Sequence, residues 1–186
     1  MTVYAYTESP VGDMLLVGSE GAGPPGRTAL VSLSLPGQKG GAVVQEGWRH
    51  APRAFDGITE QLRAYFDSTL TRFDVEYADA GTDFQRRVWR ALEDIPYGTT
   101  VSYGEIAALV GSSGAGVRAV GTAIGRNPLL VVRPCHRVIG ADGALRGYAA
   151  GLDRKRLLLG LEGTGAGSGA GGAVVSGTAE VGALTS

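Results

Sequence analysis

The sequence predicts an α+β fold in which a small β-sheet and one helix come first and a mostly helical part follows. The first third of the 186 residues consists of short apolar or alternating runs separated by glycine and proline, a pattern typical of strands and turns. From residue 82 onward, apolar residues recur at helical spacing behind two capping-box sequences. We therefore expect a scaffold domain at 1–80, a second domain at 81–163 and a flexible tail at 164–186.

Three strands and one helix are expected in the scaffold domain. The strand segments are residues 3–6, 14–17 and 29–35. A helix follows them, because apolar residues recur every three or four positions at Phe55, Ile58, Leu62 and Tyr65. No chemical role can be assigned to these residues, and the pattern favours a structural one.

Short helices joined by tight turns are expected in the second domain. Residues 82–85 and 102–105 both have the form of a capping box. The helix behind the first box is broken by Pro-Tyr-Gly at 96–98. The helix behind the second leads through small residues at 111–114 into another helix over 116–126. The last two helices match a helix-turn-helix, although many helical hairpins share this pattern.

The last of these helices has a thin surface. Ala119, Gly121 and Thr122 are small, and Arg118 is the prominent charge. Small side chains allow a close approach either by another helix or by a DNA groove, and the sequence leaves both possibilities open.

Charge is divided unequally along the chain. Residues 1–83 contain 6 Lys and Arg against 11 Asp and Glu, whereas residues 84–162 contain 11 against 6. A basic half is typical of a protein that faces an anionic partner such as nucleic acid. The alternative is that the opposite charges pack the two halves together.

The chain is expected in the cytoplasm, without a membrane segment. No apolar run reaches the ~20 residues that span a bilayer, and the first residues lack the features of a signal peptide. A single cysteine fits a reducing compartment. Only His50 and His136 accompany it, so a Cys/His zinc cluster cannot form, and we expect no metal and no cofactor.

The only cysteine, Cys135, lies among charged residues. His136 follows it directly, and Arg133 and Arg137 flank the pair. A neighbouring imidazole and positive charge favour the thiolate, which is the nucleophilic form, and His136 could take the proton directly or through water. The alternative is that Cys135 is a small buried hydrophobic residue without a chemical role.

The segment around Cys135 resembles the active-site signature of the O6-alkylguanine-DNA alkyltransferases, also called methylated-DNA–protein-cysteine methyltransferases. In that family an aliphatic residue precedes Pro-Cys-His-Arg-Val, which here occupies 134–138. Other blocks match in family order at 95–98, 102–107, 118–121, 127–128, 147–149, 155, 157–158 and 162–163. The resemblance is strong over 83–163, and only general over the N-terminal part.

The resemblance implies a ribonuclease-H-like scaffold, a helix-turn-helix and a single-use alkyl acceptor. Cys135 would attack the alkyl carbon on O6 of guanine, with His136 as base through a bound water and Glu162 orienting it. Asn127 would be a hinge that hydrogen-bonds the backbone and joins the last helix to an active-site strand. Because a thioether is a poor leaving group and no second cysteine exists, each molecule would act once.

The resemblance also implies that a monomer binds duplex DNA through the minor groove and flips the damaged base out of the stack. Arg118 would fill the gap left by the base, and Tyr103 would crowd the 3′ phosphate. The small residues Ala119, Gly121 and Thr122 would lie in the groove, where readout depends little on sequence. The base pocket would be lined by Pro134, Tyr148 and Ala149. Activity on O4-alkylthymine stays open.

Two positions depart from the family pattern. Arg133 replaces an aliphatic residue, and it could lower the thiol pKa, contact DNA or point to solvent. Ala150 replaces a glycine, which could restrict the pocket loop and the size of the alkyl group.

Two other functions would share parts of this pattern. A binder of alkylated DNA without transfer activity would lack the cysteine that is present here. A helix-turn-helix regulator with a redox thiol would need a recognition helix with longer side chains for base contacts.

Overall fold

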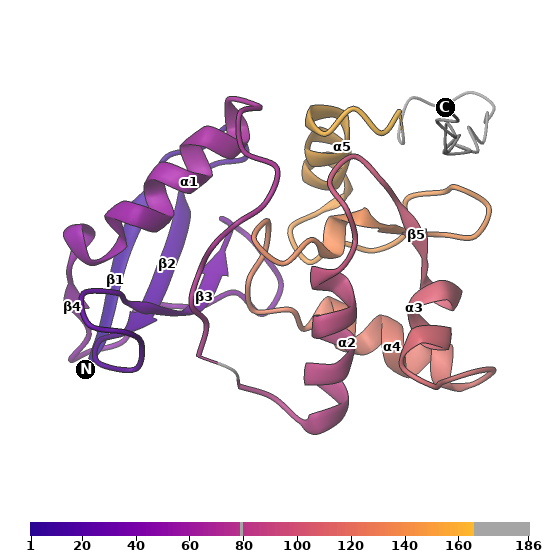
Figure 1. Cartoon of the computed structure of the whole chain (residues 1–186), viewed down its shortest axis with the longest axis horizontal. Coiled ribbons are helices and arrows are strands. Elements are labelled where there is room, and N and C mark those ends of the chain that lie inside the picture. The colour runs from indigo at the N-terminus through magenta and orange to yellow at the C-terminus, as the bar shows by residue number, and fades with distance from the viewer. Residues whose placement is uncertain (79, 166–186) are drawn as a thin grey trace, which may run out of the picture.

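The computed structural model describes residues 1–78 and 80–165, and it confirms the α+β architecture (Figure 1). A sheet with one helix forms one side of the molecule, and four further helices form the other. Residues 166–186, which make up nearly all of the expected tail, lie outside the described residues.

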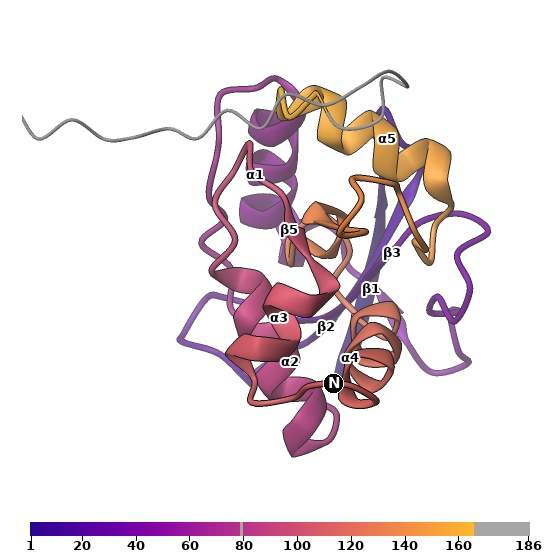
Figure 2. The same ribbon diagram turned by 90° about the vertical axis from the view of Figure 1, so that its right-hand side faces the viewer.

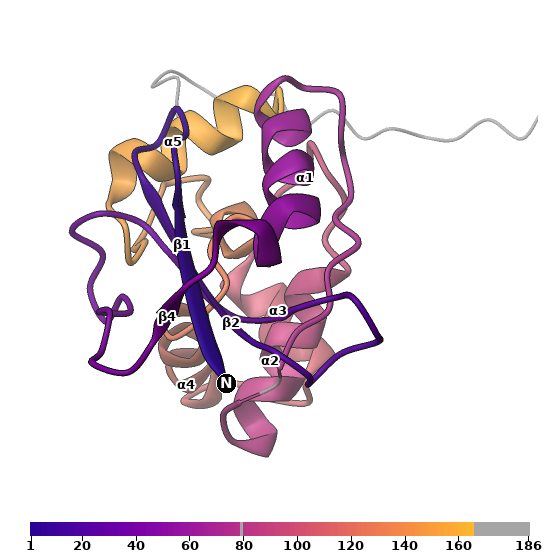
Figure 3. The ribbon, with the colours of Figure 1, turned by 90° about the vertical axis from the view of Figure 1, so that its left-hand side faces the viewer.

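The sheet of the scaffold has four strands in the order β3-β2-β1-β4. The strands β1 (Thr2–Thr7), β2 (Met14–Ser19) and β3 (Ala29–Ser34) form an antiparallel meander, as the three segments predict. The fourth, β4 (Arg49–His50), pairs parallel to β1, and Figure 3 shows this pair toward the viewer. With only two residues, β4 carries no periodicity and was not predicted.

Helix α1 (Asp56–Phe66) follows a short 3-10 turn, η1 (Pro52–Phe55), and packs on the sheet (Figure 1). Its predicted apolar stripe is buried: Phe55, Ile58, Leu62 and Tyr65. Gly18 lies at a bulge in β2, where a Cβ atom would come within 3.0 Å of the Phe55 ring. The glycine therefore allows the start of the helix to approach the sheet closely.

Both capping boxes begin helices as predicted. Thr82 caps α2 (Asp83–Glu93) and Ser102 caps α3 (Tyr103–Leu109), and both hydrogen bonds of each box are present. Helix α4 (Gly116–Gly125) ends one residue before its predicted end. Figure 2 shows α3 and α4 side by side, as expected for a helix-turn-helix.

Three elements near the site were not predicted. The strands β5 (Val101–Ser102) and β6 (Val138–Ile139) form a two-stranded parallel pair. The last described helix, α5 (Leu152–Leu161), begins behind Gly151, whose φ of 94° suits a glycine. Helix α5 is only weakly amphipathic, so its sequence has no clear helical stripe.

The active-site strand that the resemblance implies after Asn127 does not form as a regular strand. Only Leu129 pairs with a strand, through an isolated bridge to Leu33 of β3, and the residues after it turn tightly. Leu33 N donates to Pro128 O at 2.9 Å, and Leu130 N donates to Leu33 O at 3.2 Å. The segment therefore ties the edge of the sheet to the helical part.

One continuous apolar core contains residues from both expected domains. Trp89 of α2 belongs to it, and its indole Nε1 donates to Ala123 O of α4 at 2.9 Å. The boundary near residue 80 therefore remains a prediction from the sequence. Within the described ranges, no helix is long and apolar enough to cross a membrane.

Replacing Ser102 by Ala should cost about 1 kcal/mol of unfolding free energy, because the Glu105 N–H loses its acceptor at the start of α3. Urea denaturation measures this difference. Ser113→Ala is the control, since its hydroxyl has no hydrogen-bond partner among the described residues. Equal stability of wild type and Ser102→Ala would contradict the expectation.

Candidate active site

Cys135 lies at the end of a tightly turned segment that begins at Asn127. The Asn127 side chain accepts a hydrogen bond from Leu129 N at 3.0 Å and donates one to Arg133 O at 2.9 Å. Between them Val131 has φ 69°, and Val132 N donates to the carbonyl of residue 130 at 2.8 Å. This is a classical γ-turn, which strains a β-branched residue. Asn127 therefore braces a strained segment directly before the cysteine.

A second tight turn sets the position of the cysteine itself. Pro134 has φ −80° and ψ 58°, and Cys135 N donates to Arg133 O at 2.8 Å, which is an inverse γ-turn. The 3-10 turn η2 (Cys135–Arg137) follows. Proline suits this position because its ring fixes φ near the required value.

Cys135 is 4% exposed and lines a cavity of about 110 Å³ between α3, α4 and the loop after Gly147. The lining residues are Tyr103, Gly121, Ile124, Gly125, Leu130, Cys135, Gly147, Tyr148 and Ala149. The expected pocket residues Tyr148 and Ala149 are therefore present. Pro134 is buried and is not among the residues that line this cavity, so its place in the base pocket stays a prediction. Ala150 does not line it either, so its side chain does not narrow the cavity.

A buried carboxylate, Glu162, connects the residues around the cysteine. Its Oε1 accepts hydrogen bonds from His136 Nε2 at 2.8 Å, Tyr65 Oη at 2.7 Å and Arg137 Nη2 at 2.9 Å. Its Oε2 accepts one from Arg137 Nε at 2.8 Å. The carboxylate follows α5 directly, and Arg137 is held further by a 2.7 Å bond from Nη1 to Ile95 O.

Protonation in this cluster follows from burial and from these bonds. Burial acts to raise the pKa of Glu162, but the hydrogen bonds from His136 and Arg137, together with the charge of Arg137, outweigh it and lower the pKa to about 2. Burial lowers the pKa of His136 despite Glu162, so the imidazole is neutral at pH 7. Burial also raises the pKa of the Cys135 thiol, against smaller opposing effects of Asn127 and Lys155. The resting cysteine is therefore a thiol.

Two buried polar atoms near the cysteine have no hydrogen-bond partner among the described residues. They are His136 Nδ1 and the Tyr148 hydroxyl oxygen. Because His136 Nε2 is engaged by Glu162, Nδ1 is the ring atom that remains available to accept a proton.

Lys155 of α5 is a site residue that the sequence matched only as part of a family block. It is fully buried, and its ammonium donates to Val138 O at 2.5 Å, Gly147 O at 3.1 Å and Arg146 O at 3.2 Å. It thereby fixes the loop that forms one wall of the cavity. Burial lowers the pKa of Lys155 to about 8.

Arg133 neither points to solvent nor lies on the surface where DNA could reach it. The side chain is 2% exposed, and its Nε donates to Glu93 Oε1 at 2.9 Å. The guanidinium lies 5.1 Å from the Tyr77 ring centre and 5.2 Å from that of Trp89. The departure from the family pattern thus has a structural role, with a small lowering effect on the thiol pKa of Cys135.

The thin face of α4 is open to solvent. Arg118, Ala119 and Thr122 are exposed, whereas the opposite side of the helix is buried. A Cβ atom on Gly125 would meet nothing within 4 Å, and one on Gly121 would meet only Tyr103, at 3.9 Å. Close packing of this face against another helix is therefore excluded within the described ranges.

Tyr103 connects this face to the cavity. Its ring lines the cavity beside Cys135, and its hydroxyl donates to Arg146 O. The predicted DNA-contacting residues and the predicted acceptor thus lie on adjoining surfaces.

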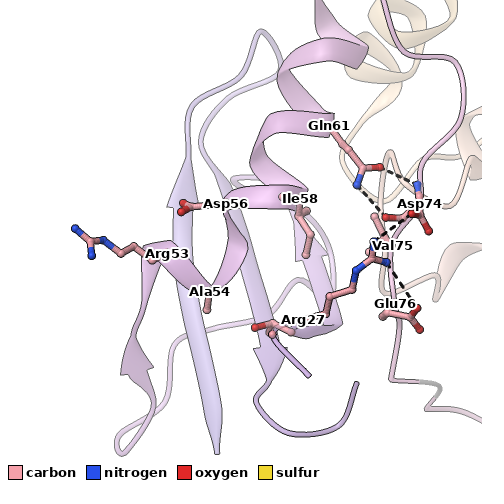
Figure 4. Close-up of a pocket in the computed structure, with 12 residues that line it drawn as sticks. Arg27, Arg53, Ala54, Asp56, Ile58, Gln61, Asp74, Val75 and Glu76 are labelled. Carbon is pink, nitrogen blue, oxygen red and sulfur yellow. Dashed lines mark hydrogen bonds and ion pairs between the residues drawn. The ribbon is translucent and has the colours of Figure 1, made fainter. Parts of the chain in front are cut away.

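Another pocket lies in the scaffold, between the start of α1 and residues 74–76 (Figure 4). Arg27 pairs there with Asp74 at 3.4 Å and Glu76 at 3.9 Å, and Gln61 bonds the backbone of Asp74 through both side-chain atoms. The pocket shares no lining residue with the cavity at Cys135. These four residues satisfy one another, whereas the side chains of Arg53 and Asp56 line the pocket without a bond to another described residue.

Fold and site together define a protein that joins a helix-turn-helix to a buried thiol, which is followed directly by a buried histidine. The family model for the 6-O-methylguanine DNA methyltransferase DNA-binding domain matches residues 83–164. The methylated-DNA–protein-cysteine methyltransferase of Mycolicibacterium paratuberculosis is 51% identical over 162 residues, covering 87% of this chain and 93% of that protein. The enzyme of the same name from Methanosarcina acetivorans is 47% identical, covering 87% and 98%.

Solved structures are similar to this chain as well. The crystal structure of Mycobacterium tuberculosis OGT in complex with DNA has a TM-score of 0.77 at 48% identity, and the match covers 87% of this chain and 93% of that chain. The chain belongs to the methylated-DNA–protein-cysteine methyltransferase family.

Stability should depend on Glu162 between about pH 4.5 and pH 2, the interval between the ordinary pKa of 4.5 and the value of about 2 in the folded protein. Because folding lowers this pKa, the carboxylate stabilises the fold above pH 4.5. This contribution, about 3 kcal/mol, is lost as the pH falls through 2. Glu162→Gln should be less stable at pH 7 and should lose less stability than wild type on acidification.

Urea denaturation at a series of pH values measures both effects. Glu46→Gln, at an exposed carboxylate, is the control and should follow the wild-type curve. If wild type and Glu162→Gln lose stability by the same amount on acidification, the lowered pKa of Glu162 does not contribute to stability.

Proposed function

We propose that this protein repairs DNA by moving the alkyl group of O6-alkylguanine onto Cys135, once per molecule. The observation that carries the proposal is the buried thiol in a small cavity, directly beside His136 and next to the exposed face of a helix-turn-helix. Membership of the methyltransferase family supports it. A binder without transfer activity is disfavoured because the acceptor cysteine is present.

In the proposed reaction, His136 Nδ1 accepts the thiol proton through a water, and Glu162 stabilises the imidazolium at Nε2. The thiolate attacks the alkyl carbon, the S–C bond forms, and the C–O6 bond breaks with its electron pair going to the guanine oxygen. A proton returned by the imidazolium or by solvent restores guanine. The product is a thioether, which the chain's single cysteine cannot reverse.

The base must leave the duplex to reach the cavity, so we infer base flipping from the minor groove. The exposed small residues of α4 allow close approach to DNA, and Arg118 on the same face is long enough to fill the vacated stack. Tyr103 lies between this face and Cys135, where it can crowd the phosphate that turns with the base. O4-alkylthymine would need the same movement.

The remaining parts of the proposal are a monomer that acts in the cytoplasm without a metal or cofactor. The lone cysteine supports a reducing compartment. The proposed displacement needs only the thiol, a base and the substrate, so it requires no cofactor chemistry.

Intact-protein mass spectrometry after incubation with duplex DNA carrying one O6-methylguanine tests the transfer. We expect one methyl increment per molecule, located at Cys135 and absent in Cys135→Ala. DNA binding without a mass change would refute the proposal and favour the non-transferring alternative.

Arg118→Ala should slow transfer from duplex DNA at least tenfold, because the flipped state loses the side chain that replaces the base; tenfold corresponds to about 1.4 kcal/mol. Transfer from the free base O6-methylguanine, which needs no flipping, should be unchanged. Single-turnover rates on both substrates measure this. Arg90→Ala, at an exposed arginine of α2, is the control. Equal slowing on both substrates would contradict the flipping role.

A further inference from the structure

The scaffold contributes one polar atom to the buried cluster. Tyr65 of α1 is fully buried, and its hydroxyl donates to Glu162 Oε1 at 2.7 Å across a sequence separation of 97 residues. This is the same oxygen that accepts from His136 Nε2 at 2.8 Å. Tyrosine and histidine therefore share one carboxylate oxygen, which Arg137 Nη2 also contacts at 2.9 Å.

This sharing affects the basicity of the imidazole. A carboxylate that accepts a hydrogen bond from a third group has less negative charge available to stabilise a proton on His136. We propose that Tyr65 is a positioning residue that restrains the thiol: its hydroxyl holds the Glu162 carboxylate and limits how readily His136 takes the proton of Cys135. This inference rests on the proposed function in assigning His136 as the base.

The hydroxyl is separable from the packing role of the ring. The Tyr65 ring contacts the rings of Phe66, Phe73 and Tyr97, with centres 5.2, 5.4 and 6.2 Å away. Phenylalanine preserves these contacts. Burial and the charge of Glu162 raise the pKa of Tyr65 above its ordinary value of 10.0, so its hydroxyl remains a neutral donor around pH 7.

The other charged or titratable groups around the cluster are all unchanged in Tyr65→Phe. They are Tyr97 from the loop after α2, Tyr103 from α3, Arg133 from the turn before η2, Cys135, His136 and Arg137 from η2, Tyr148 from the loop before α5, Arg154 and Lys155 from α5, and Glu162 directly after it. A change in the pH profile can therefore be assigned to the missing hydroxyl.

Limiting the ionisation of Cys135 would protect a thiol that can react only once. A thiol that is permanently ionised would be consumed by any small electrophile or oxidant that reached it. Burial already keeps Cys135 protonated, and a weakened base keeps the proton in place until a substrate occupies the cavity.

The test is the pH dependence of the reaction of Cys135 with iodoacetamide, followed by mass spectrometry in wild type, Tyr65→Phe and Tyr97→Phe. Among the described residues the Tyr97 hydroxyl bonds only to Leu161 O, at 3.5 Å, so Tyr97→Phe is a matched control in the same aromatic cluster. Without the Tyr65 hydrogen bond, the Glu162 carboxylate stabilises the protonated His136 ring more strongly. In Tyr65→Phe the midpoint of the low-pH limb should rise by about one pH unit, the scale of one hydrogen bond to a charged group.

The plateau rate should rise as well, by up to about tenfold, while the rates converge at low pH, because the Cys135–His136 pair titrates as a unit. If the Tyr65 hydroxyl only stabilises the fold, Cys135 in Tyr65→Phe should react with iodoacetamide more slowly than in wild type, or with an unchanged pH profile. An unchanged or lowered plateau in Tyr65→Phe, or the same shift in Tyr97→Phe, would overturn the proposal.

Two further measurements keep the test decisive. The wild-type protein should show a slowly exchanging Tyr65 hydroxyl proton with a nuclear Overhauser effect to the His136 Nε2 proton, and absence of that signal would overturn the proposal without any substitution. Transfer from DNA is measured in parallel with the probe. If wild type fails to transfer, the proposed function fails, whereas the iodoacetamide profiles still decide the role of Tyr65.

Discussion

The buried carboxylate of Glu162 is the constraint on which the arrangement of the site depends. An ionised group in the interior is costly unless hydrogen bonds and an opposite charge surround it. Tyr65 comes from the scaffold helix, His136 and Arg137 come from the turn that carries the cysteine, and the carboxylate itself ends α5. Three distant segments must therefore meet at one point before the charge is satisfied. The continuous core that crosses the expected domain boundary is the packing that brings them there.

A second constraint is the strain held directly before the nucleophile. Val131 occupies a backbone region that β-branched residues avoid, and the Asn127 side chain holds the turn on both sides of it. Lys155 similarly fixes the opposite wall of the cavity through three carbonyl groups. Side chains rather than regular strands therefore position the thiol. These hydrogen bonds fix the backbone on both sides of the cavity.

Local signals were sufficient for most of the fold and for part of the site. The capping residues Thr82 and Ser102 begin helices where expected, and the alternating runs form strands, because both patterns act over a few residues. Strands of two residues and the weakly amphipathic α5 leave no such pattern. Arg133 was ambiguous because its partners Glu93, Tyr77 and Trp89 are brought to it only by tertiary packing. Tyr65 was read correctly as a core position, but its hydroxyl partner lies 97 residues away. A tyrosine on an apolar stripe was the one available hint, since a buried hydroxyl needs an acceptor.

The position of Glu162 at the end of the last described helix has a consequence for biosynthesis. A chain emerging from the ribosome presents the scaffold first, then the cysteine, and α5 only afterwards. Until α5 docks, His136 lacks its acceptor, and Arg137 lacks its counter-charge. An unfinished chain therefore contains Cys135 and His136 without the contacts that Glu162 supplies in the folded protein. Its thiol also lacks the burial that raises the pKa in the folded state, so it is more open to small electrophiles during synthesis than after folding. Docking of α5 ends this interval of exposure.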